Sequence, residues 1–157
     1  MIIDFNSAVQ EKYKRINEIN EMFLATCADE IVTSRLVSVS CFENAVYFLS
    51  WNHHMKCKQI DKNPNICFSF KNLQMIGTAC IRGNPKNENN REISLKFKSK
   101  QPDIYTYFSS LDGMVIVESK ISCIKSWEKT NEGYFIDHID IKNQTAYRIK
   151  PQEELKF

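Results

Sequence analysis

The sequence has no apolar run approaching about 20 residues, so no membrane-spanning helix is expected. Its first residues lack the apolar core of a signal peptide, and we therefore expect a cytoplasmic protein without membrane association. No basic run is present, and a net charge of +2 is too small to indicate nucleic-acid binding. The six cysteines contain no CxxC pair, which favours reduced, buried thiols over a disulfide framework.

The chain also lacks internal repeats, linkers and low-complexity segments. Its 157 residues, 43% of them hydrophobic and 25% charged, have the composition of an ordinary globular protein. That length is sufficient for one hydrophobic core. We therefore expect a single domain that spans residues 1–157.

The segment from residue 31 to 64 is predicted to form a hairpin that leads into a helix. β-Branched residues and turn residues divide it into a strand over 32–41, a turn at 43–44, a strand over 46–49 and a helix over 53–62. Asn52 can cap this helix, and Asn63-Pro64 ends it.

Two cations in this segment indicate an anion site. Arg35 lies in the middle of a strand, where a charge is costly without a partner. Lys56 lies in the first turn of the helix, the end that attracts anions. A hairpin that leads into a helix N-terminus could bring both cations to one phosphate.

The remainder of the chain is predicted to consist mainly of further strands. A capping-box pattern at 7–10 and a helical apolar period predict a first helix over 6–21. Further elements are predicted as strands over 23–27, 66–70, 74–83, 114–127 and 134–149, with a helical excursion within 86–111. Gly77 inside a strand predicts a bulge, and Pro102 can open a helix. Six or seven short strands with few helices indicate a mainly β fold, a small antiparallel barrel.

An ordered set of short motifs resembles the pyridoxamine 5′-phosphate oxidase-like family. The motifs are Phe23-Leu24-Ala25-Thr26, Ser34-Arg35-Leu36-Val37, Val46-Tyr47-Phe48-Leu49-Ser50, Lys56 and Asn63-Pro64, with Gly77 and Trp127 further along the chain. The resemblance implies a six- to seven-stranded antiparallel split barrel of Greek-key type. It also implies non-covalently bound FMN at the interface of a homodimer.

The same resemblance assigns roles to individual residues. Arg35 and Lys56 would hold the FMN phosphate, and Leu36, Val37, Leu49 and Ser50 would line the flavin. An amide from either Asn72 or Gln74 would contact the flavin, and the sequence leaves this choice open.

The chain departs from the family at several positions. His54 occupies a position where the family often has Ser or Thr, and an imidazole can still donate one hydrogen bond to phosphate. Trp51 is bulky and could stack on the ring or partly fill the site. The Arg-x-His substrate motif of genuine pyridoxamine phosphate oxidases is absent, so that reaction is not predicted.

Two functional hypotheses follow from the resemblance. The first is an FMN-dependent oxidoreductase that acts on an unknown small molecule or electron donor, with a deazaflavin as another possible ligand. The second is a non-catalytic flavin- or haem-binding module with a degenerate site, in which His53 or His54 could ligate haem iron. His54 and Cys57 share a helix face, but no second Cys/His pair has suitable spacing, so no metal site is predicted.

Overall fold

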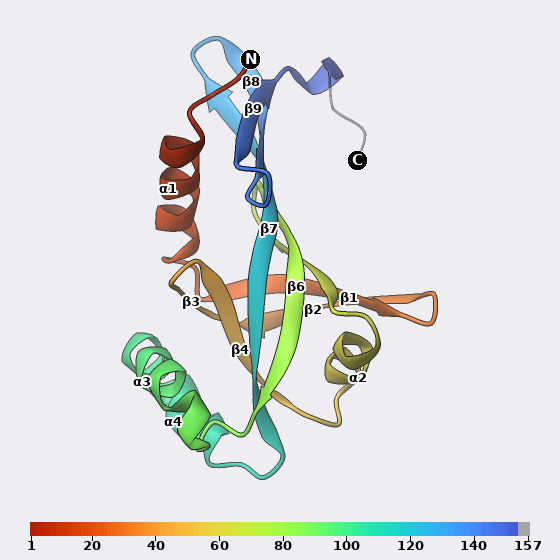
Figure 1. Ribbon diagram of the computed structural model, residues 1–157, viewed down its shortest axis with the longest axis vertical. Helices are drawn as coiled ribbons and strands as arrows, with labels where there is room; N and C mark the ends of the chain where they lie inside the picture. Colours follow the sequence, from red (N-terminus) through yellow and green to blue (C-terminus); the bar gives the residue numbers. More distant parts are fainter. Residues whose placement is uncertain (154–157) are drawn as a thin grey trace.

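The computed structural model describes residues 1–153, which form a nine-stranded antiparallel sheet with accessory helices (Figure 1). The strands are β1 (Glu21–Ala28), β2 (Ile31–Ser38), β3 (Ser40–Phe42), β4 (Ala45–Trp51), β5 (Asn65–Phe70), β6 (Leu73–Gly83), β7 (Met114–Thr130), β8 (Gly133–Asp140) and β9 (Thr145–Ile149). Their order is β2-β1-β5-β6-β7-β4-β3, and β8 and β9 extend the sheet from β7. The predicted mainly β fold is confirmed.

The barrel is split where β2 and β4 separate. β2 and β3 stand at the two ends of the strand path and follow each other in the chain. β3 pairs with β4 from Phe42↔Ala45 to Ser40↔Tyr47, and this ladder does not continue into β2. The remainder of β4 therefore diverges from β2, which leaves an open seam between the two strands.

The inner side of the sheet holds the main core. Its largest fully buried members include Phe48, Phe68, Met22, Leu24 and Met75. Alternate residues of each strand contribute to it, as expected for a curved sheet with one apolar face.

Helix α1 (Phe5–Ile16) packs on this core beside β8 and β9, where Figure 1 shows it running along the sheet. Tyr13 and Ile16 are buried in the core, as the helical period predicted. The predicted capping box is wrong, because the Asp4 side chain caps the helix by accepting from the Ser7 amide at 2.8 Å. The helix therefore begins and ends earlier than predicted.

The structure has more strands than the sequence predicted. The predicted strand over 32–41 is interrupted at Val39, and the segment over 134–149 is the β8–β9 hairpin. The bulge at Gly77 is confirmed, because the β6–β7 register shifts between Ile76 and Gly77. A Cβ atom at Gly77 would collide with the carbonyl oxygen of Lys120, so the close approach requires glycine.

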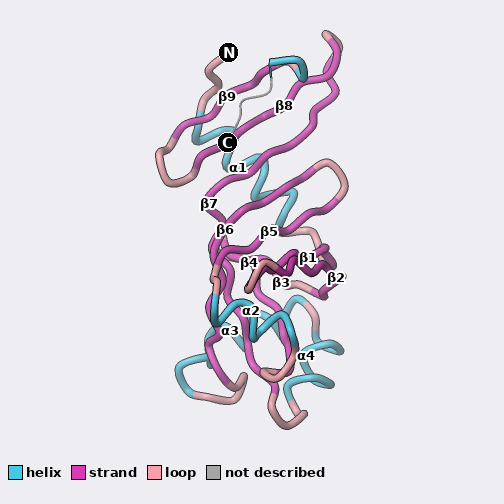
Figure 2. Tube along the Cα trace, turned by 90° about the vertical axis from the view of Figure 1, so that its right-hand side faces the viewer, coloured by secondary structure: helices cyan, strands magenta, loops and turns pink. Residues whose placement is uncertain are grey.

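The helical excursion comprises η1 (Glu88–Asn90), α3 (Arg91–Lys100) and α4 (Pro102–Ser109). Phe97 of α3 packs with Phe42, Tyr47 and Ile116 on the outer side of the sheet. Pro102 opens α4, as predicted. Figures 1 and 2 show both helices beside β4 at the end of the barrel away from β8 and β9. None of the helices described is long and apolar enough to cross a bilayer.

Helix α2 (Met55–Lys62) begins later than predicted. His54 rather than Asn52 is its N-cap, because the His54 amide donates to the Trp51 carbonyl at 3.0 Å and holds residues 51–54 in a turn. The helix ends at Lys62 before Asn63, as predicted, and Lys56 lies in its first turn.

Candidate functional site

The open seam holds a pocket of about 160 Å³, which we call the seam pocket. Strands β2 and β4, the start of α2, helix α4 and the start of β7 supply its walls. Its lining residues are Leu36, Val37, Ser38, Leu49, Ser50, Trp51, His54, Lys56, Ile104, Phe108 and Met114. The seam pocket thus brings together most of the residues that the resemblance assigned to the flavin.

Arg35 lies beside the seam pocket and is held by neutral oxygens. Its Nη1 donates to the Leu24 carbonyl at 3.2 Å and to Thr26 Oγ1 at 2.7 Å, and its Nη2 donates to Thr33 Oγ1. A guanidinium has five N–H groups, and these bonds use three of them. The remaining two, on Nε and Nη2, point from one edge of the group and match two oxygens of one phosphate.

Lys56 and His54 both line the seam pocket and lie next to each other. Lys56 Nζ is 3.3 Å from His54 Nδ1, and the His54 ring packs against Trp51 at a centroid distance of 5.1 Å. Burial lowers the pKa of Lys56, and the charge of Arg35 lowers this pKa further. Arg35 and Lys56 are therefore close enough to repel each other.

In the described part of the chain, Arg35 and Lys56 are not paired with acidic side chains. Within residues 1–153, no carboxylate oxygen lies within ion-pair distance of Arg35 or Lys56. Burial lowers the pKa of Arg35, and burial together with Lys56 and His53 lowers the pKa of His54. An anion between these groups would relieve their repulsion, so the arrangement suits an anionic ligand.

Asn72 and Gln74 do not lie at the seam pocket of this chain. Both lie near the start of β6, and Asn72 is committed to other partners: its Nδ2 donates to the Trp127 carbonyl at 2.5 Å. Asn72 Oδ1 accepts from Arg15 at 2.9 Å, while Gln74 is exposed on the outer face of the sheet. A role for either amide at this chain's own pocket is therefore not supported by its position.

Several residues of the site were not predicted. Ile104 and Phe108 of α4 close one wall, where Phe108 meets Trp51 edge-on at 5.9 Å. Thr33 and Gln59 hold Arg35 in place from β2 and α2. The only sequence signal for Thr33 is its position two residues before Arg35, on the same strand face.

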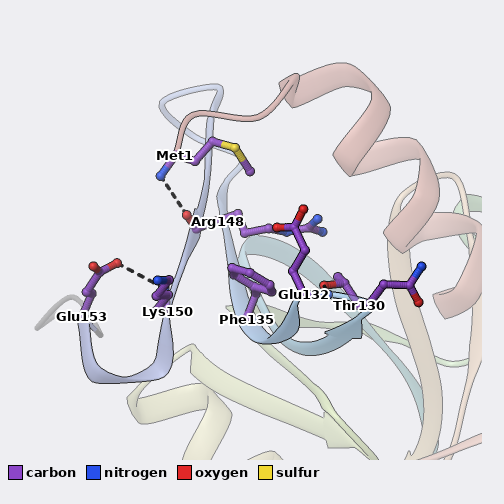
Figure 3. A pocket seen from close by; sticks show the side chains of 8 residues that line it. Met1, Thr130, Glu132, Phe135, Arg148, Lys150 and Glu153 are labelled. Carbon is purple, nitrogen blue, oxygen red and sulfur yellow. Dashed lines mark hydrogen bonds between the residues drawn. The ribbon is translucent and has the colours of Figure 1, made fainter.

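A larger pocket, about 580 Å³, lies at the opposite end of the molecule between the N-terminus and the β7–β8 turn (Figure 3). Two of its charged groups, the Met1 amine and the Arg148 guanidinium, have partners. The Met1 amine donates to the Arg148 carbonyl at 2.8 Å, and the Arg148 side chain binds Asp137 at 2.7 and 2.9 Å. Arg148 of this pocket is therefore neutralised by Asp137, whereas Arg35 beside the seam pocket has only neutral partners.

The cysteines and histidines form no metal site in the described part of the chain. Among residues 1–153, no group of three or more His, Cys, Asp or Glu side chains is arranged to hold a metal ion. Cys57 of α2 is fully buried, whereas His54 lines the seam pocket.

Neither protein-family models nor curated proteins match the sequence, but solved structures match the fold. ChuZ from Campylobacter jejuni has a TM-score of 0.74 at 13% identity, over 98% of this chain and 68% of that one. HutZ, the haem storage protein of Vibrio cholerae, has a TM-score of 0.59 at 12% identity, over 76% and 91%. A predicted pyridoxamine 5′-phosphate oxidase from Listeria innocua has a TM-score of 0.58 at 16% identity, over 75% and 97%.

At these low identities, the structural similarity establishes a shared fold but not a shared ligand or activity. The matched regions cover three quarters or more of this chain. The resemblance inferred from the short motifs is thus confirmed at the level of the fold. The chain has the split-barrel fold of the pyridoxamine 5′-phosphate oxidase-like proteins.

Proposed function

We propose that this protein is a flavoprotein that binds FMN non-covalently at the seam pocket and acts as an oxidoreductase on a small molecule. The observation that carries the proposal is the half-buried pair of Arg35 and Lys56 without a carboxylate partner in residues 1–153. A phosphate dianion is the ligand group that best compensates two such cations.

The residues present fit FMN in both charge and shape. Arg35 would bind two phosphate oxygens through its free edge, and Lys56 would add a third contact. The His54 side chain makes no capping bond to the first amides of α2, so the amides next to Lys56 would be further donors for an anion. Trp51, Leu49 and other apolar residues would hold the ring and exclude water.

When bound, FMN would supply the redox chemistry, and the protein would bind, orient and shield it. The substrate and the electron donor are not specified by the residues of the pocket.

A second copy of the chain would complete the site. A pocket of about 160 Å³ is smaller than the roughly 300–1,000 Å³ of typical ligand sites, so it cannot enclose a flavin alone. Leu36 lines the pocket and is also 52% exposed on the outer face of β2, directly opposite the exposed Phe23. This exposed apolar face is therefore continuous with the pocket, and we propose that a homodimer covers both.

An absorbance spectrum tests the proposed function. We expect the purified protein, after incubation with FMN and desalting, to retain about one flavin per chain. NAD(P)H or dithionite should reduce this flavin, and oxygen should reoxidise it. No retained flavin, with no binding below high micromolar concentrations, would exclude the FMN function.

Haem binding is the second candidate function, and two observations favour it. The imidazole of His54 lines the seam pocket, and burial lowers its pKa, which favours the neutral form that ligates iron. HutZ, with the same fold, is a haem storage protein. A Soret band upon haem addition that His54→Ala abolishes would support this function, and an unchanged band in that variant would exclude His54 as the ligand.

A further inference from the structure

Gln59 of α2 is a buried polar residue that the resemblance did not assign to the site. It is 3% exposed and lies one turn after Lys56, on the same side of the helix. Its Oε1 accepts from Thr26 Oγ1 at 2.5 Å and from Thr33 Oγ1 at 2.6 Å. Its Nε2 donates to the Ile31 carbonyl at 2.8 Å, which fixes the orientation of the amide.

The protons of this network can be arranged in only one direction. A guanidinium donates and never accepts, so Thr26 and Thr33 must both accept from Arg35. Each hydroxyl has a single proton, and the nearest acceptor for it is Gln59 Oε1. The two hydroxyls are 3.4 Å apart, which is too long to compete with the bonds to Gln59.

We infer that Gln59 is a positioning residue for anion binding: through Thr26 and Thr33 it holds the Nη1 and Nη2 groups of Arg35 and so leaves the edge formed by Nε and Nη2 to a phosphate. This inference rests on the proposed function and extends it to a residue that would not contact the ligand. Because every member of the network is neutral, it orients Arg35 without reducing its charge.

The test compares FMN with riboflavin, which lacks the phosphate, by flavin fluorescence titration of the full chain. We expect Gln59→Leu to weaken FMN binding about tenfold, the size typical of a lost charge-assisted bond, and to leave riboflavin binding within about twofold. In an Arg35→Ala background, Gln59→Leu should cause no further loss of FMN affinity. Ile60→Val is the matched control, since Ile60 is equally buried on α2 and packs in the apolar core.

Three results would overturn the inference: an unchanged FMN preference in Gln59→Leu, equal losses for FMN and riboflavin, or an undiminished loss in the Arg35→Ala background. If Gln59→Leu does not fold, Thr33→Val interrupts the same path at a half-buried position and should give the same selective loss.

A ligand-free measurement separates this inference from the proposed function. In protein labelled with ¹⁵N-arginine, the Nη–H signals of Arg35 should be resolved in the wild type and averaged in Gln59→Leu. If the wild type shows no preference for FMN, the proposed function fails, and this spectrum alone decides the positioning role. Unchanged Arg35 signals in Gln59→Leu would then refute it.

Discussion

Arg35 and Lys12 are both withdrawn from water, but they differ in their partners. Lys12 is 1% exposed and binds Glu11 and Glu128 at 2.8 Å each and Asp137 at 3.2 Å. Burial alone would lower the pKa of Lys12, but these carboxylates outweigh it and raise the pKa. Arg35 has only neutral partners. Lys12 therefore serves the fold, whereas the charge of Arg35 is not neutralised by its partners, as the proposed phosphate site requires.

The two cations are therefore predicted to affect stability differently. Lys12→Met leaves Asp137 and Glu128 without a central cation, and we expect the unfolding free energy to fall by about 3 kcal/mol. Arg35→Met removes an uncompensated charge, and we expect a change below about 1 kcal/mol in either direction. Urea denaturation of both variants measures this difference. A larger loss for Arg35→Met would mean that Arg35 is mainly structural.

Gly77 provides a second prediction at this scale. Gly77→Ala places a methyl group against the Lys120 carbonyl and must displace β7, so we expect a loss of roughly 2–3 kcal/mol. Thr78→Ala, at the exposed next position, should cost less than about 1 kcal/mol. Thermal unfolding of the two variants compares them, and equal midpoints would argue against a tight bulge.

Among the elements, α1 is attached to the β7–β8–β9 extension by charge as well as by apolar packing. Glu128 of β7 binds Lys12 and Arg15 of α1 at 2.8 Å each, and Asp137 of β8 binds both Lys12 and Arg148. Burial alone would raise the pKa of Glu128, but its hydrogen bonds from Lys12 and Arg15 lower it to about 2.

This shift predicts how stability depends on pH. Because the folded-state pKa of Glu128 is lower than its ordinary value of 4.5, the stabilisation is complete above pH 4.5 and is lost as the pH falls toward about 2. We expect Glu128 to contribute roughly 2–3 kcal/mol of this loss. Denaturant midpoints between pH 5 and 2 should fall less steeply in Glu128→Gln than in the wild type; parallel curves would contradict the assignment.

Elements with a strong local signal could be predicted from the sequence. The Pro64 helix stop, the Pro102 helix start and the alternating strands are determined by short-range chemistry, and the structure confirms them. The break at Val39 could not be predicted, because it depends on how β3 pairs with β4 while β2 diverges. Two features of the site also depend on tertiary packing and could not be predicted from local sequence. One is the wall that α4 contributes to the seam pocket, and the other is the hydrogen bond by which Gln59 supports Arg35 through Thr33.

At the scale of the whole molecule, the outer face of β1 and β2 is unusually apolar for an exposed surface. Phe23, Val32 and Leu36 are each more than half exposed there, and Trp127 lies on the same face of β7. Contiguous exposed apolar side chains on a sheet favour association with another protein surface. A second copy would bury this face and close the seam pocket.

Light scattering tests this assembly. We expect the wild type to have twice the mass of the 18.4-kDa chain, and Phe23→Lys to shift it toward the monomer. Leu95→Lys is the matched control, since Leu95 is equally exposed but lies on α3, away from this face. A monomeric wild type at micromolar concentrations would contradict the proposed homodimer.

The central claim is that Arg35 and Lys56 together bind the phosphate of FMN, and an equilibrium titration of FMN against riboflavin tests it most directly. We predict that the wild type binds FMN at least tenfold more tightly than riboflavin. Arg35→Ala and Lys56→Ala should each remove most of that preference without weakening riboflavin binding. Equal affinity of the wild type for both flavins, or a preference that survives in both variants, would contradict the claim.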